Sequence, residues 1–117
     1  MTIRRDLLSW QLTGYAAAHR ARANLILHVF SVPLCWIGTA LIVAGVVLSN
    51  ERPVAIGIAV WLIARLLQGR GHRGERTPPQ PFLGPLDFVS RFVVEQLVTF
   101  PRFVLGGGFA RAWRAFP

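Results

Sequence analysis

The sequence predicts an all-α integral membrane protein, a helical hairpin flanked by N-terminal and C-terminal amphipathic helices that lie at the membrane interface. The 117-residue chain is 53% hydrophobic, which is high for a soluble domain of this size. Two long apolar runs are separated by a short polar turn, and proline-rich and glycine-rich segments divide the rest of the chain. The length allows one domain and no internal repeat is present, so we expect residues 1–117 to form a single membrane domain.

An amphipathic helix is expected near the N-terminus, over about residues 2–20. Its predicted inner face carries four residues spaced by four, three and four positions, namely Leu8, Leu12, Tyr15 and His19. We expect a helix break at residues 20–23. Asn24 then stands before the first apolar run, where an asparagine side chain can accept hydrogen bonds from free amides and cap the next helix.

The two apolar runs are expected to form a tight membrane hairpin. Residues 25–49, which include His28, carry no aspartate, glutamate, lysine or arginine. At about 1.5 Å per residue this run is long enough for a hydrocarbon core of about 30 Å. The second run, about residues 53–68, is shorter and holds Arg65 in its last turn, from which the guanidinium can reach the headgroups. Pro53 suits the first position of the returning helix.

The basic residues indicate a membrane partner and an orientation. All 13 are arginines, against five acidic residues, and they give a formal net charge of +8. They form no run and no aromatic-flanked patch, which argues against a nucleic-acid partner. Arginines precede and follow the hairpin, whereas its turn holds only Arg52 beside Glu51, so the positive-inside rule places both termini in the cytoplasm. The arginine-only set suggests a bacterial inner membrane.

Beyond the hairpin we expect a loop over residues 69–84 and an amphipathic helix over about residues 85–105. Prolines in the loop remove helical hydrogen-bond donors. The helix carries a polar stripe at spacings of four, formed by Asp87, Arg91, Glu95 and Thr99. We expect the stripe to lie in the interface or pack against the rest of the protein, with Glu95 paired to Arg91. Pro101 should kink this helix, and the glycines at 106–108 should end it.

The chain has three histidines, and the hairpin would bring all of them to one face of the bilayer. His19 and His28 flank the entrance to the first apolar run, and His72 follows the second. His19 and His28 are nine residues apart, about 180° around a continuous helix, so only the predicted break lets them converge. A lone histidine near a membrane is more often an interfacial anchor, but the joint spacing favours a shared metal site.

Two spaced patterns resemble the signature blocks of the Mpo1-like family, a former domain of unknown function typified by an endoplasmic-reticulum dioxygenase of 2-hydroxy fatty acids. The first block reads Tyr15-x3-His19-x4-Asn24-x3-His28-x4-Pro33, and the second reads Gly71-His72-x2-Glu75-x3-Pro79. The chain departs from the family in having one tight hairpin between the blocks, where eukaryotic members carry a second pair of spans. It also lacks a further histidine that some members have between the blocks.

The resemblance implies an Fe(II)-dependent dioxygenase that shortens a 2-hydroxy fatty acid by one carbon without 2-oxoglutarate. The catalytic residues and iron ligands that it implies are His19, His28, His72 and Glu75, a set that suits non-haem iron. Glu75 could instead orient a histidine, or pair with Arg73 or Arg76 at the surface. Tyr15 and Asn24 are expected to orient ligands or cap helices. Arg73 or Arg76 could pair with the substrate carboxylate.

Non-catalytic alternatives stay open at this point. The protein could be a small membrane scaffold or a lipid-binding module, with histidines that cap helices and hold the loop. A structural zinc site is a further alternative, because histidine ligands also suit zinc. The expected partners are the membrane, a lipid or fatty-acid substrate and dioxygen, and a homo-oligomer is compatible with the sequence.

Overall fold

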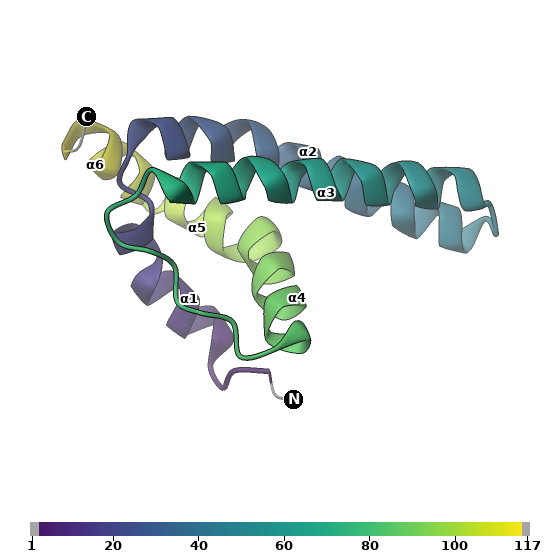
Figure 1. Ribbon diagram of the computed structural model, residues 1–117, viewed down its shortest axis with the longest axis horizontal. Helices are drawn as coiled ribbons and strands as arrows, with labels where there is room; N and C mark the ends of the chain where they lie inside the picture. Colours follow the sequence, from purple (N-terminus) through teal and green to yellow (C-terminus); the bar gives the residue numbers. More distant parts are fainter. Residues whose placement is uncertain (1–2, 116–117) are drawn as a thin grey trace.

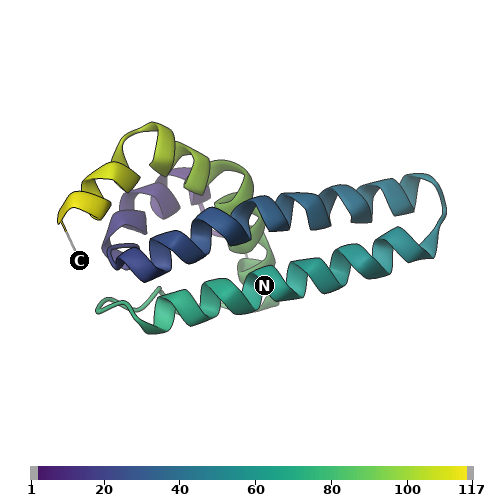
Figure 2. The ribbon, with the colours of Figure 1, turned by 90° about the horizontal axis from the view of Figure 1, so that it is seen from above.

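A computed structural model describes residues 3–115, and within this range the regular structure is helical, with no strand. The two longest helices, α2 (Arg22–Val47) and α3 (Glu51–Arg73), form an antiparallel hairpin along the 47 Å length of the molecule (Figure 1). The shorter helices gather against one half of the hairpin and leave its tip uncovered (Figures 1 and 2). The predicted all-α hairpin with flanking helices is confirmed. The ends of the predicted 1–117 domain lie outside the described residues.

The N-terminal helix is shorter than predicted and ends in a sharp bend. Helix α1 (Leu7–Tyr15) continues as a 3₁₀ turn, η1 (Ala16–Ala18), and the chain then turns at residues 19–21 before α2 begins. The predicted break is therefore present, one or two positions early. The prediction that Asn24 caps α2 is wrong, because Ala21 is the cap residue and Asn24 lies inside the first turn of the helix.

Helix α3 is longer than the predicted segment 53–68 at both ends. It begins at Glu51, where the side chain of Asn50 accepts a hydrogen bond from the Arg52 amide at 3.2 Å. It continues to Arg73, so the predicted loop starts only at residue 74 and His72 lies on the last helical turn. Both α2 and α3 are consequently long and apolar enough to cross a bilayer.

Glycines allow the two hairpin helices to approach closely. A Cβ atom on Gly38 would lie 2.9 Å from the carbonyl oxygen of Gly57, and a Cβ on Gly57 would lie 2.6 Å from that of Gly38. Any larger residue at either position would therefore push the backbones apart. Beside this contact, Trp61 Nε1 donates to Thr39 Oγ1 at 3.2 Å, which satisfies the indole within the packed surface.

The predicted helix over residues 85–105 is present but contains a π-helical segment that the sequence did not predict. Helix α4 (Pro85–Val94) passes into η2 (Glu95–Thr99) and then into α5 (Phe100–Leu105), and the direction changes between α4 and α5 (Figure 1). Pro101, which cannot donate a helical hydrogen bond, is the second residue of α5. Gly107, with φ at 85°, separates α5 from a further helix, α6 (Gly108–Ala115).

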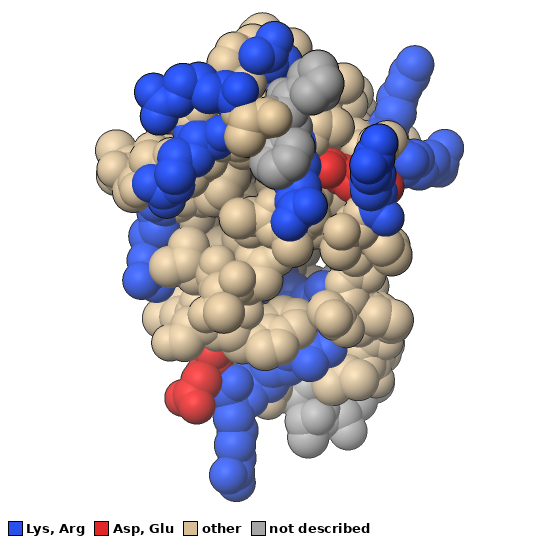
Figure 3. All heavy atoms as spheres, turned by 90° about the vertical axis from the view of Figure 1, so that its left-hand side faces the viewer, with Lys and Arg blue, Asp and Glu red and all other residues tan. Residues whose placement is uncertain are grey.

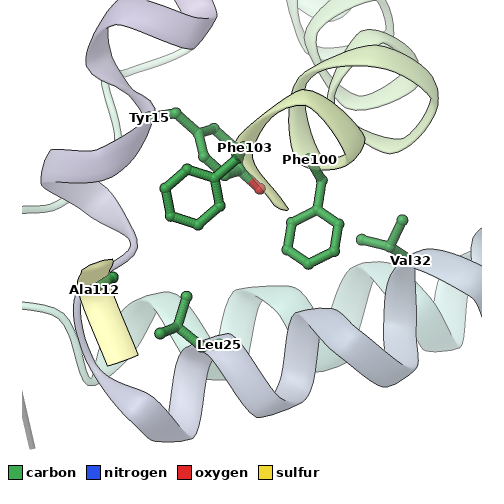
Figure 4. Close-up of a cluster of buried hydrophobic side chains, with 6 residues drawn as sticks. All are labelled: Tyr15, Leu25, Val32, Phe100, Phe103 and Ala112. Atoms are coloured by element: carbon green, nitrogen blue, oxygen red, sulfur yellow. The ribbon is translucent and has the colours of Figure 1, made fainter. Parts of the chain in front are cut away.

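Buried side chains join these short helices to the base of the hairpin. The larger cluster draws on α1, α2, α5 and α6 and consists of Tyr15, Leu25, Val32, Phe100, Phe103 and Ala112 (Figure 4). A smaller cluster of Cys35, Ala64 and Phe92 joins α4 to both hairpin helices. The lone cysteine is thus a small buried core residue. Together the two clusters hold the short helices α1, α4, α5 and α6 against the hairpin.

The polar stripe of α4 and η2 packs against the N-terminal segment. Gln11 Nε2 donates to the carbonyl of Arg91 at 2.9 Å, and Thr99 donates from its hydroxyl to the Gln11 side chain. Asp87 contacts Arg4 at 3.2 Å and Arg91 at 3.4 Å. The stripe is therefore a buried polar contact between helices, which is one of the two arrangements that the sequence allowed.

Candidate metal centre

Three histidines from three different segments meet at the base of the hairpin. His19 follows η1, His28 lies in the second turn of α2, and His72 lies in the last turn of α3. Their ring centroids are 4.7 Å apart for His19 and His28, 4.6 Å for His19 and His72, and 5.2 Å for His28 and His72. In a continuous helix His19 and His28 would point in opposite directions. The bend at residues 19–21 turns the two side chains toward each other and so allows the three histidines to meet.

Glu95, the first residue of η2, supplies a carboxylate to the same cluster. Its Oε2 atom lies 3.2 Å from His28 Nε2 and 3.4 Å from His19 Nε2. One ligand atom from each of the four residues lies within 4.8 Å of the other three. Donors at about 2.1 Å from a single ion stand up to about 4 Å apart, so a small contraction would place all four on one ion. The group His19, His28, His72 and Glu95 could therefore bind a metal ion.

The tautomers of two of the histidines suit metal binding. His19 Nδ1 lies 2.7 Å from the carbonyl oxygen of Tyr15, and His28 Nδ1 lies 3.0 Å from that of Asn24. A carbonyl oxygen only accepts hydrogen bonds, so each Nδ1 must carry the proton. The Nε2 atom of the neutral ring then directs a lone pair into the cluster, which is the usual arrangement of a metal-ligating histidine. Burial also lowers the pKa of His19, which favours this neutral form.

Two buried nitrogen atoms of the cluster have no hydrogen-bond partner, namely His19 Nε2 and His72 Nδ1. A buried polar atom that lacks a partner costs about 1–3 kcal/mol, and such atoms are uncommon in native proteins. Imidazole nitrogens and a carboxylate oxygen together are a donor set that binds iron or zinc. The residues present thus fit a metal ion, which would give these nitrogens a partner.

Tyr15 holds the carboxylate of the cluster in place. Its hydroxyl donates to Glu95 Oε2 at 2.7 Å, and its ring stacks on His19 with centroids 3.6 Å apart. Burial and the nearby Glu95 raise the pKa of Tyr15 well above its ordinary value, so the hydroxyl keeps its proton. Burial alone would raise the pKa of Glu95, but the two histidines that face its carboxylate, His19 and His28, bring it well below its ordinary value. Tyr15 therefore orients the Glu95 carboxylate.

The π-helical segment that carries Glu95 is tied to both hairpin helices. Gln68 Nε2 donates to Gln96 Oε1 at 2.7 Å, and Gln96 Nε2 donates back to Gln68 Oε1 at 3.0 Å. Trp36 Nε1 donates to the Gln96 carbonyl at 2.7 Å. π-Helical turns are rare and are frequently found at functional sites. Here these bonds fix the turn whose first residue, Glu95, faces the histidines.

Glu75, which the resemblance implies as a ligand, lies outside this group and has another task. Its carboxylate accepts hydrogen bonds from the backbone amides of Arg20 and Ala21, the shortest at 2.9 and 3.0 Å, and from Asn24 Nδ2 at 2.8 Å. It thereby holds the two residues that precede α2, close to the helix N-terminus, where the helix dipole favours negative charge. The carboxylate among the histidines is Glu95, and Glu75 instead fastens the bend that brings His19 beside His28.

Asn24 and Gly71 complete this brace. The fully buried Asn24 amide donates to the Ala18 carbonyl at 3.3 Å as well as to Glu75. A Cβ atom on Gly71 would overlap Asn24 Oδ1, so a glycine is needed where α3 passes this side chain. This contact gives a physical reason for the glycine that precedes His72 in the second sequence block.

The expectation that Glu95 pairs with Arg91 is wrong. Arg91 donates to Asp87 at 3.4 Å and to the carbonyls of Gln80 and Pro81 at 2.9 and 3.2 Å. Its charge is therefore neutralised one turn earlier in the stripe. This leaves the Glu95 carboxylate available to Tyr15 and the histidines.

A cavity of about 910 Å³ adjoins the cluster. Tyr15, His19, His72 and Glu95 line it, together with apolar side chains from α1, the proline loop and α4, namely Trp10, Pro78, Pro79, Phe82 and Phe92. Its volume lies in the range of about 300–1,000 Å³ that is typical of small-molecule sites. Of the four residues that could bind metal, His28 alone is not on the lining. An ion held here would thus be reached from the cavity side.

The two arginines predicted to bind a substrate carboxylate are placed differently. Arg73 lies on the wall of the cavity, whereas Arg76 does not line it. Arg65 and Arg91, which the sequence did not single out for this role, are also on the wall. Arg65 could have been noticed from sequence as a charged residue within an apolar helix long enough to cross a membrane, a position that commonly marks a functional site.

Comparison of the chain with protein-family models, with curated proteins and with solved structures gives no match. The resemblance to the Mpo1-like family therefore stays a prediction that rests on the two sequence blocks. The structure gives those blocks a physical arrangement. Their three histidines meet in space, and Asn24 and Glu75 hold the bend between the first two.

Proposed function

We propose that this protein is a membrane-bound, Fe(II)-dependent dioxygenase that removes one carbon from 2-hydroxy fatty acids. The observation that carries the proposal is the convergence of three imidazoles and one carboxylate on the wall of a cavity. Structural metal sites are usually closed by four protein ligands in a tetrahedron, whereas catalytic sites keep a position open toward the substrate. The cavity beside His19, His72 and Glu95 favours the second kind of site.

The donor set favours iron among the metals that such enzymes use. Histidines combined with one carboxylate and open positions are characteristic of non-haem Fe(II) oxygenases. The lone cysteine, Cys35, belongs to the core cluster with Ala64 and Phe92 and is not among the four donors. When bound, Fe(II) would supply coordination for the hydroxyl and carboxylate oxygens of the acid and for dioxygen.

The proposed overall reaction balances without a further reductant. A 2-hydroxy acid and dioxygen give the acid one carbon shorter, carbon dioxide and water. The bond between C1 and C2 breaks, C2 becomes the new carboxyl carbon, and the four electrons that reduce dioxygen come from the acid itself. This agrees with the absence of a 2-oxoglutarate requirement that the resemblance implies.

The protein's own residues would hold and shield the reacting acid. Tyr15 orients the Glu95 carboxylate through its 2.7 Å hydrogen bond. Phe100 and Phe103, which are 6% and 4% exposed, seal the cluster on the side of α5 and keep water from it. The apolar wall residues of the cavity would receive the acyl chain, because a hydrocarbon tail gains free energy on leaving water.

The fold suits a substrate that comes from the bilayer. About 20 residues of α2, counted back from its end at Val47, cover the hydrocarbon thickness of about 30 Å and place His28 near the headgroups. Arginine side chains gather at the end of the molecule opposite the hairpin tip (Figure 3). We infer that this end lies at the cytoplasmic surface, where a fatty acid also places its carboxylate.

The proposed function is tested by turnover. The protein would be purified in detergent without oxygen, loaded with Fe(II), and given air and a long-chain 2-hydroxy fatty acid labelled with ¹³C at C1. We expect the acid one carbon shorter and labelled carbon dioxide, both abolished by a chelator. His72→Ala and Glu95→Gln should lose turnover, whereas Glu51→Gln, which removes a carboxylate at the distant hairpin tip, should keep it.

Other outcomes would decide against the proposal. Retained turnover in folded His72→Ala or Glu95→Gln protein would reject this site. If no product formed at any chain length from folded, iron-loaded protein, the dioxygenase assignment would fail and a scaffold or another substrate would replace it. Tight zinc binding without an exchangeable coordination position would favour a structural metal site.

A further inference from the structure

Arg65 reaches along the cavity wall toward the histidine cluster. It lies seven residues before His72, about two helical turns, and therefore on the same face of α3. Both residues line the cavity. The Arg65 side chain runs in the direction of His72, since its Nη1 atom would lie 2.9 Å from a Cβ placed on Gly69. The guanidinium thus lies about one turn from His72.

Gly69 gives this guanidinium the space that it occupies. Glycine within a helix costs about 0.8–1.0 kcal/mol relative to alanine. At this position even a methyl group would come within 2.9 Å of Arg65 Nη1 and would displace it. Gly69 weakens the helix, but its missing side chain lets the Arg65 side chain lie against α3 and face the cavity.

No carboxylate neutralises Arg65 among residues 3–115. The ion pairs in this range join Asp87 to Arg4 and Arg91, and Glu95 to two histidines. The Arg65 guanidinium instead lies over the ring of Phe88, 5.2 Å from its centroid. A half-buried cation beside apolar walls is unfavourable unless it is paired. Arg65 is therefore ready to receive an anion from the cavity.

The other arginines of the wall are less suited to this task. Arg91 is buried, but Asp87 and two carbonyl groups already satisfy it. Arg5 and Arg73 are exposed, where water screens their charge. Arg65 combines partial burial, a place on the wall and the lack of a carboxylate partner.

We propose that Arg65 binds the carboxylate of an amphiphilic acid in this cavity and so sets the specificity for acids over neutral lipids. A guanidinium can hold a carboxylate through two parallel hydrogen bonds, which fixes orientation as well as position. A carboxylate bound between this guanidinium and His72 would bring the next carbon of the acid to the cluster. The placement of C2 rests on the proposed dioxygenase function, but the binding of an anionic amphiphile does not.

The test measures binding to the metal-free protein, so that it does not depend on turnover. A fluorescent fatty acid bound in detergent would be displaced by 2-hydroxyhexadecanoic acid or by its methyl ester. We expect the wild-type protein to prefer the acid. Arg65→Gln should bind the acid about tenfold more weakly or worse, because a hydrogen-bonded charge pair is lost, and should bind the ester as before. Arg65→Lys should be intermediate.

Arg70→Gln is the matched control, because it removes the same charge from an exposed position on the same helix that does not line the cavity. It should leave both affinities unchanged. Equal acid affinity in wild-type and Arg65→Gln protein would overturn the proposal. Equal loss of acid and ester binding in both Arg65 variants would also overturn it, since the residue would then only shape the cavity.

The two proposals can fail separately. Acid binding that depends on Arg65, in a protein without turnover, would reject the dioxygenase and keep the carboxylate site. Turnover with an unchanged KM in Arg65→Gln would reject the carboxylate site and keep the dioxygenase.

Discussion

Replacement of Tyr15 by phenylalanine should weaken metal binding at the cluster without unfolding the protein. The Tyr15 hydroxyl donates to Glu95 Oε2 at 2.7 Å, and the ring stacks on His19. Phenylalanine keeps the ring and its packing but removes the donor. A hydrogen bond to a charged group is worth about 1.5–3 kcal/mol, and a factor of ten in affinity is about 1.4 kcal/mol. We therefore expect metal affinity to fall by about 10- to 100-fold, the range found when a ligand loses its supporting hydrogen bond.

The assay is a titration of the metal-free protein with Co(II) at fixed pH, followed by visible absorption and by competition with a chelator. Circular dichroism would check that the helices are intact. In the Glu95→Gln background, Tyr15→Phe should have little further effect, because the charged acceptor is already gone. Unchanged affinity in Tyr15→Phe, or an equal loss in both backgrounds, would refute the reasoning.

Three further substitutions, with Gly14→Ala as a control, test the brace and the polar stripe. Glu75→Ala should lower the free energy of unfolding by about 1–3 kcal/mol, because the Arg20 and Ala21 amides lose their acceptor, while the folded protein still binds metal. Complete loss of metal from the folded variant would contradict this supporting role of Glu75. Gly71→Ala should weaken metal binding at the site, because the new Cβ atom would overlap Asn24. Gly14→Ala has nothing within 4 Å of the new methyl group and should instead stabilise α1 by about 0.5–1 kcal/mol. Thermal melting together with a metal titration distinguishes the two effects. Burial alone would raise the pKa of Asp87, but a backbone amide and two arginines bring it below its ordinary value. The ionised carboxylate therefore contributes its full stabilisation above about pH 4, and this stabilisation is lost as the pH falls through the folded-state pKa. Asp87→Asn should therefore be less stable at neutral pH and show a flatter acid limb in denaturation, and identical pH profiles would speak against this.

The hairpin and the meeting of the histidines could be predicted because they depend on local patterns. The uncharged run before residue 49 requires a long helix, and the short polar turn requires an antiparallel return. Given these two helices, a break near residue 20 is enough to bring His19 toward His28 and His72. Helix ends were less predictable, because α3 continues through a polar segment to Arg73 where tertiary contacts support it.

The choice between Glu75 and Glu95 depended on contacts distant in the sequence. Glu75 lies three residues after His72, but α3 ends between them and the chain turns Glu75 toward the amides at the start of α2. Glu95 lies far from every histidine in the sequence. The available signal was its position in a strongly apolar helix, where a carboxylate needs a partner. Arg91 has a carboxylate four residues before it, in Asp87, and another four residues after it, in Glu95. The structure pairs Arg91 with Asp87, and local spacing alone does not distinguish the two.

The π-helical segment and the role of Arg65 could not be read from local propensity. Neither the Gln68–Gln96 amide pair nor the Trp36 bond to the Gln96 carbonyl has a short-range pattern, because the partners are 28 and 60 residues apart. The position of the Arg65 guanidinium likewise depends on the absence of a side chain at Gly69 and on the walls that enclose the cavity.

X-ray absorption spectroscopy at the iron edge, on protein loaded with Fe(II) without oxygen, tests the proposed site most directly. We expect one iron per chain, a coordination shell that contains three imidazole nitrogens and a carboxylate oxygen, and a change in that shell when a 2-hydroxy acid is added. Glu95→Gln should alter the spectrum, and Glu75→Gln should not. A folded wild-type protein that holds no stoichiometric metal, or an iron shell without imidazole, would contradict the assignment of His19, His28, His72 and Glu95 as a metal centre.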